Sequence, residues 1–291
     1  MGILLQLIFN GLGIGAIYAL VALGFVLLIR AASVVNFGQG EFAMLGAYAL
    51  VVFATVLGIN YYVSILIAIV LMAAFGVLFA GATYWPLRNR GGIPVIISTI
   101  GASIFLENMV LVLYGPAAVQ IDGLWDNPGI QVGPVFMDSQ YLSILIVTAV
   151  LVLLQYLIFE KTILGKKLQA TSQDKEMASL LGIPVAGMIL ITFAYSSAIG
   201  GIAGILVAPI LFVSTQMAGL IALKAFAANI IGGYGSIPGA ILGGLALGVV
   251  ETLGAAYISV PYKDAFAFLM LLMFLMVRPR GLFGERIAEK A

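Results

Sequence analysis

The sequence predicts an all-α protein that crosses a membrane several times, and its composition is the first reason. Of its 291 residues, 63% are hydrophobic and 9% are charged, and the mean hydropathy is +1.19. So few polar residues do not cover the surface of a soluble globule. Several windows hold the roughly 20 apolar residues that a bilayer core about 30 Å thick requires. Only helices satisfy every backbone polar group in such windows, and the alternating ten-residue pattern of a transmembrane barrel is missing from the sequence.

Nine apolar segments follow one another in a single transmembrane domain, residues 1–291. They cover residues 4–29, 39–57, 62–85, 94–114, 141–159, 188–208, 217–231, 237–256 and 265–277. The first has no basic flank before it and no small-residue cleavage site after it, so we expect a retained helix and not a signal peptide. Segments 217–231 and 265–277 are short, and either one could be a re-entrant or tilted element. The sequence therefore predicts a bundle of about eight or nine transmembrane helices.

The distribution of basic residues predicts the orientation. With nine crossings and a cytoplasmic carboxyl terminus, eleven of the thirteen Lys and Arg residues fall inside, Lys263 alone falls outside, and Lys224 lies within a span. The inside residues are Arg30, Arg88, Arg90, Lys161, Lys166, Lys167, Lys175, Arg278, Arg280, Arg286 and Lys290. Because cytoplasmic loops are enriched in Lys and Arg, we expect the amino terminus outside and the carboxyl terminus in the cytoplasm.

Residues 160–187 form the most polar segment, with seven of the 25 charged residues, and are expected to lie in the cytoplasm. Thr171 and Asp174 have the spacing of a capping box, and Gly182 followed by Pro184 is typical of a helix end. A short apolar edge between these signals consists of Met177, Leu180 and Leu181. The segment therefore predicts a short surface helix that a partner outside the membrane could bind.

One long loop, residues 115–140, is expected on the outside. Its distinctive residues are Asp122, Trp125, Asp126, Pro128 and Asp138, and it has no basic residue. Two interpretations remain open: a solvated loop, and a docking surface for an extracytoplasmic partner.

Pairs of glycines four residues apart predict close helix packing. The pairs are Gly11 with Gly15, Gly200 with Gly204, Gly239 with Gly243, and Gly244 with Gly248. This spacing allows two backbones to approach closely in lipid. Residues 232–239 contain four glycines and a proline, so they are expected to break a helix, which within a membrane is tolerated only where the backbone is buried or lines a cavity.

Ionisable residues within apolar segments are costly, so Glu41, Glu107, Lys224 and Glu251 are functional candidates. Glu41 follows a polar and Gly-rich interruption that contains Asn36 and Gln39, and Lys224 precedes Asn229. One interpretation is a path for a zwitterionic solute, whose two charges would pair with Lys224 and with Glu41 or Glu251. The other is an internal ion pair or amide network that fixes the helix register, and positions near the membrane surface would lower the cost of Glu41 and Lys224.

Several kinds of catalysis are excluded by missing residues. The chain has no histidine and no cysteine, so it has no Ser-His pair, no imidazole metal ligand and no disulfide. We place no aspartate within a span, and the pattern G-x-x-x-x-G-K-[ST] of a P-loop is missing. We therefore expect no catalytic residues, no cofactor and no metal; the chain transports, channels or scaffolds, and any ATP is hydrolysed by another subunit.

Four stretches and the carboxyl-terminal ending resemble one known family. The stretch GLGIGAIYALVALGFVLLIRAASVVNFGQGEFAMLGAY, residues 11–48, resembles the amino-terminal signature of LivH-type permease subunits of branched-chain amino acid ABC importers. Further similar stretches are ISTIGASIFLEN (97–108), GKKLQATSQDKEMASLLGIP (165–184), KAFAANIIGGYGSIPGAILGGLALG (224–248) and the ending RPRGLFG from Arg278. The similarity covers nearly the full chain, but these motifs do not distinguish branched-chain amino acids from urea, short amides or other amino acids.

The resemblance implies a type II importer permease fold and a set of partners. These are a second, related permease, two ATP-binding subunits and a periplasmic solute-binding protein, in the inner membrane of a bacterium, with membrane lipid around the bundle and no nucleic acid. It also implies that residues 165–184 contain the coupling helix that contacts the ATPase. The residues expected at that contact are Lys166, Lys167, Asp174, Glu176, Met177, Leu181 and Gly182. The residues expected along the substrate path are Asn36, Gln39, Glu41, Lys224, Asn229 and Glu251.

Two alternatives come from other classes of protein. An ion-coupled secondary transporter would use Glu41, Glu107 or Glu251 as a relay and would move its solute alone, but it leaves the cytoplasmic helix without a role. A membrane scaffold that transports nothing would explain the glycine packing and the docking helix, but not the charges within spans.

Overall fold

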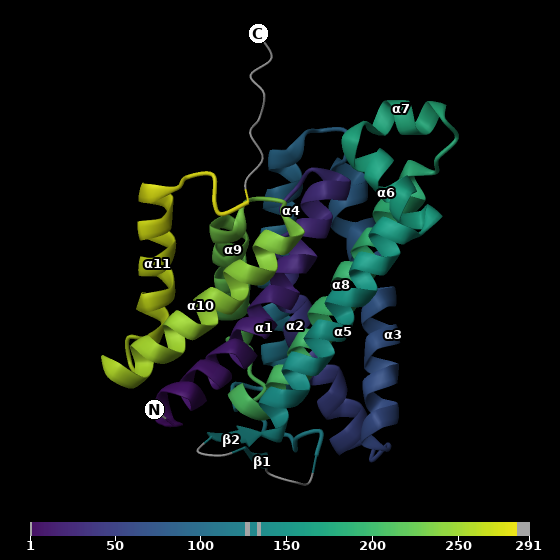
Figure 1. Cartoon of the computed structure of the whole chain (residues 1–291). Helices are drawn as coiled ribbons and strands as arrows, with labels where there is room; N and C mark the ends of the chain where they lie inside the picture. The colour runs from purple at the N-terminus through teal and green to yellow at the C-terminus, as the bar shows by residue number, and fades with distance from the viewer. Residues whose placement is uncertain (1, 126–128, 133–134, 284–291) are drawn as a thin grey trace.

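The computed structural model describes residues 2–125, 129–132 and 135–283, which form eleven α-helices and one small hairpin (Figure 1). In chain order the α-helices are α1 (Gly2–Ala32), α2 (Gln39–Leu50), α3 (Tyr61–Phe79), α4 (Gly92–Tyr114), α5 (Ser139–Lys161), α6 (Ile163–Gln173), α7 (Lys175–Leu180), α8 (Val185–Leu211), α9 (Met217–Gly232), α10 (Ile237–Tyr257) and α11 (Lys263–Val277). Two π-helical turns (Val51–Val56 and Ala80–Tyr84) and a 3-10 turn (Trp85–Leu87) extend α2 and α3. Strands β1 (Gly129–Val132) and β2 (Val135–Asp138) pair antiparallel, with Ile130 opposite Met137.

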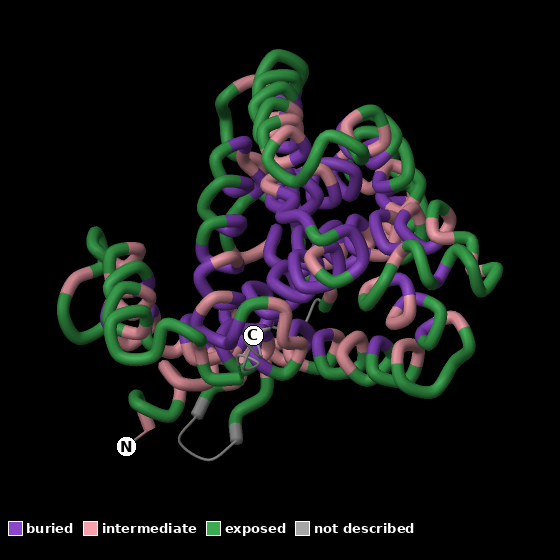
Figure 2. Tube along the Cα trace, turned by 90° about the horizontal axis from the view of Figure 1, so that it is seen from above, coloured by how far each residue is buried: buried purple, intermediate pink, exposed green. Residues whose placement is uncertain are grey.

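The prediction of an all-α membrane bundle is confirmed. A helix occupies each of the nine predicted segments, and seven of these helices are long and apolar enough to cross a bilayer. The other two, α9 with 16 residues and α11 with 15, are the segments that the sequence marked as short. Buried residues gather at the centre of the bundle and exposed ones at its periphery, as the view along its long direction shows (Figure 2).

The first and last glycine pairs pack against each other, which brings α1 and α10 into contact along much of their length. A Cβ added to Gly15 would lie 2.7 Å from the carbonyl oxygen of Gly244, and one added to Gly11 would lie 3.1 Å from that of Gly248. No larger side chain fits these positions without moving a backbone. The predicted close approach of two helices is therefore confirmed, and the sequence had already marked both partners.

The remaining two pairs also lie at helix contacts. Gly200 and Gly204 on α8 face α2, where a Cβ on Gly200 would lie 2.9 Å from that of Phe42. Gly239 and Gly243 on α10 lie against the backbone of α9. The small residues thus fix α1, α2, α8, α9 and α10 as one closely packed group.

Two short helices begin inside the bundle and not at its surface. The side chain of Gln39, the first residue of α2, lies against Gly24 of α1, eight residues before the end of that helix. At 1.5 Å per residue, this places Gln39 about 12 Å below the end of α1. Gly40 in turn lies against the carbonyl of Ala218, at the start of α9. Residues 33–38 and 212–216 therefore enter the bundle as non-helical chain.

The Gly-rich segment 232–239 is not a break at depth, which corrects the expectation drawn from its composition. Its non-helical part, residues 233–236, connects α9 to α10 next to Arg30 in the last turn of α1. Gly233 has φ +111° and Gly235 has φ +82°, so glycine is needed here for backbone conformation. The chain enters the membrane interior at the two other segments, 33–38 and 212–216.

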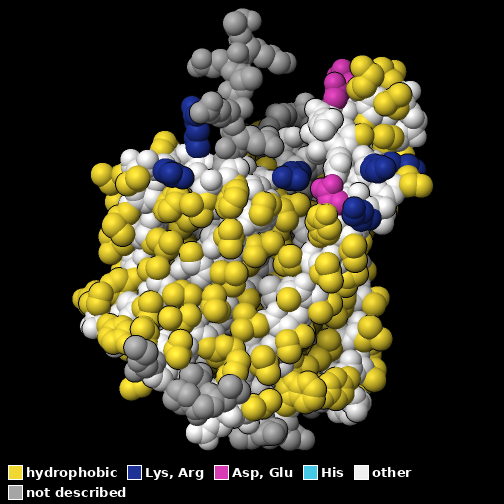
Figure 3. All heavy atoms as spheres, viewed as in Figure 1, with side chains coloured by type: hydrophobic (Ala, Val, Ile, Leu, Met, Phe, Trp, Pro, Cys, Tyr) yellow, Lys and Arg dark blue, Asp and Glu magenta, His cyan; other side chains and the backbone are white. Residues whose placement is uncertain are grey.

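The two ends of the bundle differ in charge. Helices α6 and α7 lie at one end together with the last turn of α11, whereas β1 and β2 lie at the opposite end (Figure 1). On the face that Figure 3 shows, the Lys and Arg side chains gather at the α7 end, above a broad apolar band. This distribution agrees with a multi-pass membrane protein.

Candidate functional site

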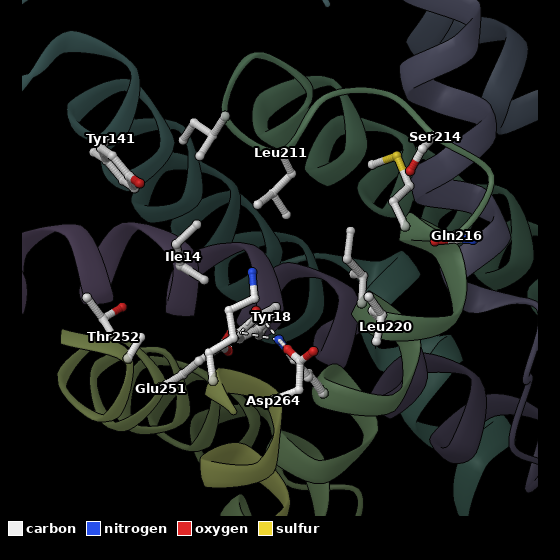
Figure 4. A pocket seen from close by; sticks show the side chains of 16 residues that line it. Ile14, Tyr18, Tyr141, Leu211, Ser214, Gln216, Leu220, Glu251, Thr252 and Asp264 are labelled. Atoms are coloured by element: carbon white, nitrogen blue, oxygen red, sulfur yellow. Dashed lines mark hydrogen bonds and ion pairs between the residues drawn. The ribbon is translucent and has the colours of Figure 1, made fainter. Parts of the chain in front are cut away.

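A cluster of charged side chains lies within the bundle where α9, α10 and α11 meet (Figure 4). The ammonium of Lys224 on α9 lies 2.6 Å from Oε1 of Glu251 on α10, and the two side chains are 4% and 7% exposed. It also lies 2.6 Å from Oδ1 of Asp264, in the first turn of α11, although without hydrogen-bond geometry. Two carboxylates thus hold one buried ammonium, which offsets the cost of its burial.

Tyr18 of α1 completes this cluster. Its hydroxyl donates a hydrogen bond of 2.9 Å to Oε2 of Glu251 and accepts one of 3.2 Å from Lys224. The ammonium of Lys224 also lies 5.4 Å from the centre of the Tyr18 ring, within the range of a cation–π contact. The close packing of α1 on α10 brings Tyr18 to the cluster, so the glycine pairs also position this site.

The cluster borders a cavity of about 360 Å³. Its walls come from α1, α5, α8, α9, α10, α11 and the segment after α8. Polar lining residues include Tyr141, Ser214, Gln216, Thr252 and Lys263, and apolar ones include Ile14, Leu211 and Leu220. Because α5 and α11 begin at the end of the bundle that carries the hairpin, the cavity lies in the half opposite α7 (Figures 1 and 4). Mostly apolar walls with a few convergent polar groups are typical of a small-molecule site.

A second polar group lies at the start of α2. The amide of Gln39 donates to the carbonyl of Ser196 at 3.2 Å and accepts from the hydroxyl of Ser196 at 2.9 Å. Glu41 accepts a hydrogen bond of 2.8 Å from Ser103 on α4. Asn36 accepts from the backbone N–H of Gly38 at 3.0 Å. All three predicted residues are buried here; Gln39 holds α2 against α8 and Glu41 holds it against α4, whereas Asn36 bonds within its own loop.

The six predicted path residues do not form one site. Lys224 pairs with Glu251, as one interpretation of the sequence allowed, and its other carboxylate partner is Asp264 and not Glu41. Asn229 lies one turn further along α9 and accepts a bond of 3.4 Å from the backbone N–H of Gly235, so it supports the connection to α10.

At the opposite end, α6 and α7 form two consecutive helices where the sequence predicted one. The predicted capping box is wrong. Thr171 is buried within α6 and donates to the carbonyl of Lys167, whereas Asp174 alone caps α7 by accepting bonds of 2.9 Å from the backbone N–H groups of Glu176 and Met177. Gly182 follows α7 with φ +77°, which confirms the predicted helix end. The seven residues expected to contact an ATPase are all exposed: Lys166, Lys167, Asp174, Glu176, Met177, Leu181 and Gly182.

Two basic side chains connect the end of α1 to other parts of this face. Lys175, the first residue of α7, donates a hydrogen bond of 2.9 Å to the carbonyl of Ala32, the last residue of α1. Burial lowers the pKa of Lys175. Arg30 donates a bond of 2.7 Å to the carbonyl of Gly235, between α9 and α10. Cations at the carboxyl end of a helix are favoured by the helix dipole and by its unpaired carbonyls.

The described part of the loop 115–140 lies against the start of α3 and α5. The Tyr61 hydroxyl donates to the carbonyl of Asp122 at 3.1 Å, Trp125 donates to Ser143 at 2.7 Å, and Asp138 caps α5 through the N–H of Gln140. Asp126 and Pro128, which the sequence also singled out, lie outside the described residues.

Sequence reasoning missed three residues of these groups: Tyr18, Asp264 and Lys175. Asp264 stands directly before the last predicted span, and its position beside a short apolar segment was the one signal that could have marked it. Tyr18 lies in an uninterrupted apolar run and gives no such signal.

Comparisons with known proteins show to which family this chain belongs. Residues 7–275 match the model of the family described as branched-chain amino acid transport system / permease component. The chain is 35% identical over 300 residues to the high-affinity branched-chain amino acid transport system permease protein LivH of Salmonella typhimurium, covering 98% of this chain and 97% of the relative. It is 34% identical to LivH of Escherichia coli K12 and 33% identical to BraD of Pseudomonas aeruginosa, each over 98% of this chain and 97% of the relative. No solved structure matches. With a family match over nearly its full length and relatives above 30% identity, the chain belongs to the family of branched-chain amino acid transport permeases.

Proposed function

We propose that this chain is a permease subunit of an ABC importer and forms half of the path by which leucine, isoleucine or valine enters a bacterial cell. The observation that supports this most directly is the apolar face of α7. Met177, Leu180 and Leu181 are 54%, 81% and 72% exposed, at the end of the bundle where basic side chains gather. Large apolar side chains in water mark a docking surface. Relatives named as permeases of branched-chain amino acid transport systems make an ATPase the fitting partner.

The proposed assembly contains a second, related permease, two ATP-binding subunits and a periplasmic binding protein. It lies in the inner membrane, with the amino terminus outside and the carboxyl terminus in the cytoplasm. The basic end of the bundle supports this orientation, because cytoplasmic ends are enriched in Lys and Arg. The outer cavity then faces the compartment from which the binding protein delivers its solute.

Coupling would run through α7 to the end of α1. Closure of the two ATPases would displace α7, and the Lys175 bond to Ala32 would transmit this displacement to α1. Arg30, two residues before Ala32, would transmit it to the connection between α9 and α10. Residues 33–38 follow Ala32 directly and lead to the buried start of α2. Both helices that begin inside the bundle would therefore respond to the same contact.

Along the path, Lys224 and Glu251 would offer charged groups in the outer half, and Asn36, Gln39 and Glu41 would control the inner half. Asn229 would act on the inner half of the path through the α9–α10 connection. A hydrated path that binds the solute weakly suffices for transport, because a tight site between the two faces would trap the solute. The binding protein would therefore set most of the importer's affinity for the solute.

The test is purification of the tagged chain from its host in mild detergent, with identification and ATPase assay of the proteins that co-purify. We expect two ATP-binding subunits and a second permease with the wild type. A Leu180→Asp variant should lose the ATPases because it places a carboxylate in the apolar face of α7. Tyr234→Asp, which adds the same charge to an exposed residue at the same end, should retain them.

Loss of the ATPases from both variants or from neither would contradict the docking role of α7. A chain that purifies alone and transports its solute without ATP would instead favour an ion-coupled transporter. If the complex forms but imports urea or short amides and no branched-chain amino acid, the importer role stands and the substrate assignment fails.

A further inference from the structure

Lys263 is the one basic residue that the sequence places on the outer side, and the structure puts it at the cavity. It is the first residue of α11, half-buried, and lines the same cavity as Lys224, Glu251 and Asp264. Among the described residues, no side chain pairs with its ammonium through a hydrogen bond or an ion pair within 4 Å. A half-buried ammonium without a counter-ion has lost part of its hydration and attracts an anion.

Asp264 differs from the other carboxylate of the cluster in its access to the cavity. Its side chain is 36% exposed, whereas that of Glu251 is 7% exposed and also accepts a bond from Tyr18. Asp264 contacts Lys224 through Oδ1. Its carboxylate has a second oxygen and several lone pairs that can accept from a ligand ammonium. Because Lys224 already has Glu251 as a partner at 2.6 Å, a ligand cation can share Asp264 without leaving Lys224 unpaired.

The cavity therefore offers an anion-seeking group and a cation-seeking group on consecutive residues. Two lysines and two carboxylates line it, so it has no net charge, which suits a ligand that is itself neutral but carries both charges. The facing wall is apolar and consists of Ile14 of α1, Leu211 of α8 and Leu220 of α9. A small neutral amide would leave the Lys263 charge uncompensated and would gain little from an apolar wall.

We propose that this cavity binds the zwitterionic amino acid itself, with the α-carboxylate on Lys263, the α-ammonium on Asp264 and the branched side chain against the apolar wall. This inference rests on the proposed importer function and adds to it a selective site in the permease. The site recognises the backbone charges of the solute as well as its side chain, and it excludes uncharged amides.

The test measures ligand contact by saturation-transfer difference NMR on the complete permease–ATPase complex in lipid nanodiscs, without the binding protein. The probes are leucine, isoamylamine, which lacks the carboxylate, 4-methylpentanoate, which lacks the ammonium, and urea. Empty nanodiscs correct for partition into lipid. We expect a saturable methyl signal from leucine and at least about tenfold weaker binding of both analogues, since each lacks one charge-assisted contact. Urea should not compete with leucine.

The variants separate a recognition role from a structural one. Lys263→Gln should weaken leucine about tenfold and abolish the preference for leucine over isoamylamine, while the preference over 4-methylpentanoate remains. Asp264→Asn should abolish the preference for leucine over 4-methylpentanoate and leave the preference over isoamylamine. Lys161→Gln, a charge removal at the exposed end of α5, should change neither. A variant that only destabilises the fold would weaken all probes together.

Three results would overturn the inference. The first is a leucine dissociation constant on the wild type equal to those of isoamylamine and 4-methylpentanoate, the second is that the two variants leave both preferences intact, and the third is that leucine gives no saturable signal. The same purified complex, reconstituted into liposomes, is tested for leucine import after the binding protein is added. If it imports leucine and any of the three results is obtained, the site is wrong and the importer function stands; if it imports no branched-chain amino acid, the proposed function itself fails.

Discussion

The buried Lys224–Glu251 pair predicts a large and strongly non-additive effect on stability. In Glu251→Gln the amide replaces a carboxylate that lies 2.6 Å from an ammonium only 4% exposed. Removal of one partner of a buried ion pair costs about 3–5 kcal/mol, because the other charge is left without compensation. Asp264 stays near Lys224 but is 36% exposed, so water screens part of its contribution. These considerations give about 3 kcal/mol for Glu251→Gln, at the lower end of that range because Asp264 remains.

The double variant shows whether this cost comes from the pair. Lys224→Met should also cost about 3 kcal/mol, because it leaves Glu251 buried and charged. Lys224→Met/Glu251→Gln removes both charges and should cost about as much as either single variant, which corresponds to a coupling energy of about 3 kcal/mol. The free energy of unfolding is measured by circular dichroism in mixed micelles of a mild detergent and SDS. Glu160→Gln, at the exposed end of α5, serves as the control and should stay within about 0.5 kcal/mol of the wild type.

Two results would refute this reasoning. A loss below about 0.5 kcal/mol in Glu251→Gln would mean that Lys224 is hydrated or held by Asp264 alone. Additive costs in the double variant would mean that the two side chains act independently in spite of their contact.

Three further predictions concern other parts of the bundle. Gly248→Leu should destabilise the fold by at least about 1–3 kcal/mol in the same micelle assay, because an added Cβ meets the backbone of Gly15; a stability equal to the wild type would contradict the close contact. Asp174→Ala should destabilise α7 by about 1 kcal/mol, seen as roughly fivefold faster amide hydrogen exchange in α7 with unchanged exchange in α8, and equal rates would show that the cap is dispensable. Lys175→Met should lower the number of solute molecules imported per ATP hydrolysed, with ATPase activity retained and with recovery in Lys175→Arg; an unchanged ratio would exclude transmission through the contact with Ala32.

Much of the fold was predictable because the bilayer imposes simple rules. Long apolar runs have to be helices, so each of the nine predicted segments contains one. The glycine pairs were equally informative, because in lipid only small side chains let backbones touch, and Gly15 and Gly244 do so. The orientation inferred from Lys and Arg counts stays a prediction, because the arrangement of the helices does not show which end of the bundle is cytoplasmic.

The depth of each break could not be read from the sequence. Glycine and proline in residues 232–239 showed that a helix stops, but not whether it stops at the surface or inside. The answer depends on how far α9 extends, and this helix begins deep in the bundle, at Met217. In the same way, Thr171 has the spacing of a cap, yet α6 continues past it and leaves the cap to Asp174. Local spacing identifies a residue that can cap a helix, whereas tertiary packing selects the one that does.

Two residues of the charge cluster could be predicted from the sequence, and the other two could not. An ionisable residue in an apolar run stands out, which marked Lys224 and Glu251. Asp264 joins them from the next helix along the chain, whereas Tyr18 is far away in the sequence and reaches them only because the glycines of α1 and α10 bring the two helices together. Composition can identify a residue that needs a partner, but the partner is selected by contacts between helices.

Helix α1 connects the charge cluster to the end of the bundle that contains α7. Tyr18 and Ile14 place it at the charge cluster and the cavity, and Arg30 and Ala32 place its last turn in contact with the α9–α10 connection and with α7. Between these points its residues are almost entirely buried, and at Gly15 its contact with α10 leaves no room for a larger side chain. A helix held in this way cannot bend locally to absorb a displacement at one end, because its neighbours fill the space around it. A force applied to α7 would therefore move α1 and α10 together, and with them the positions of Tyr18 and Glu251 in the half of the bundle opposite α7.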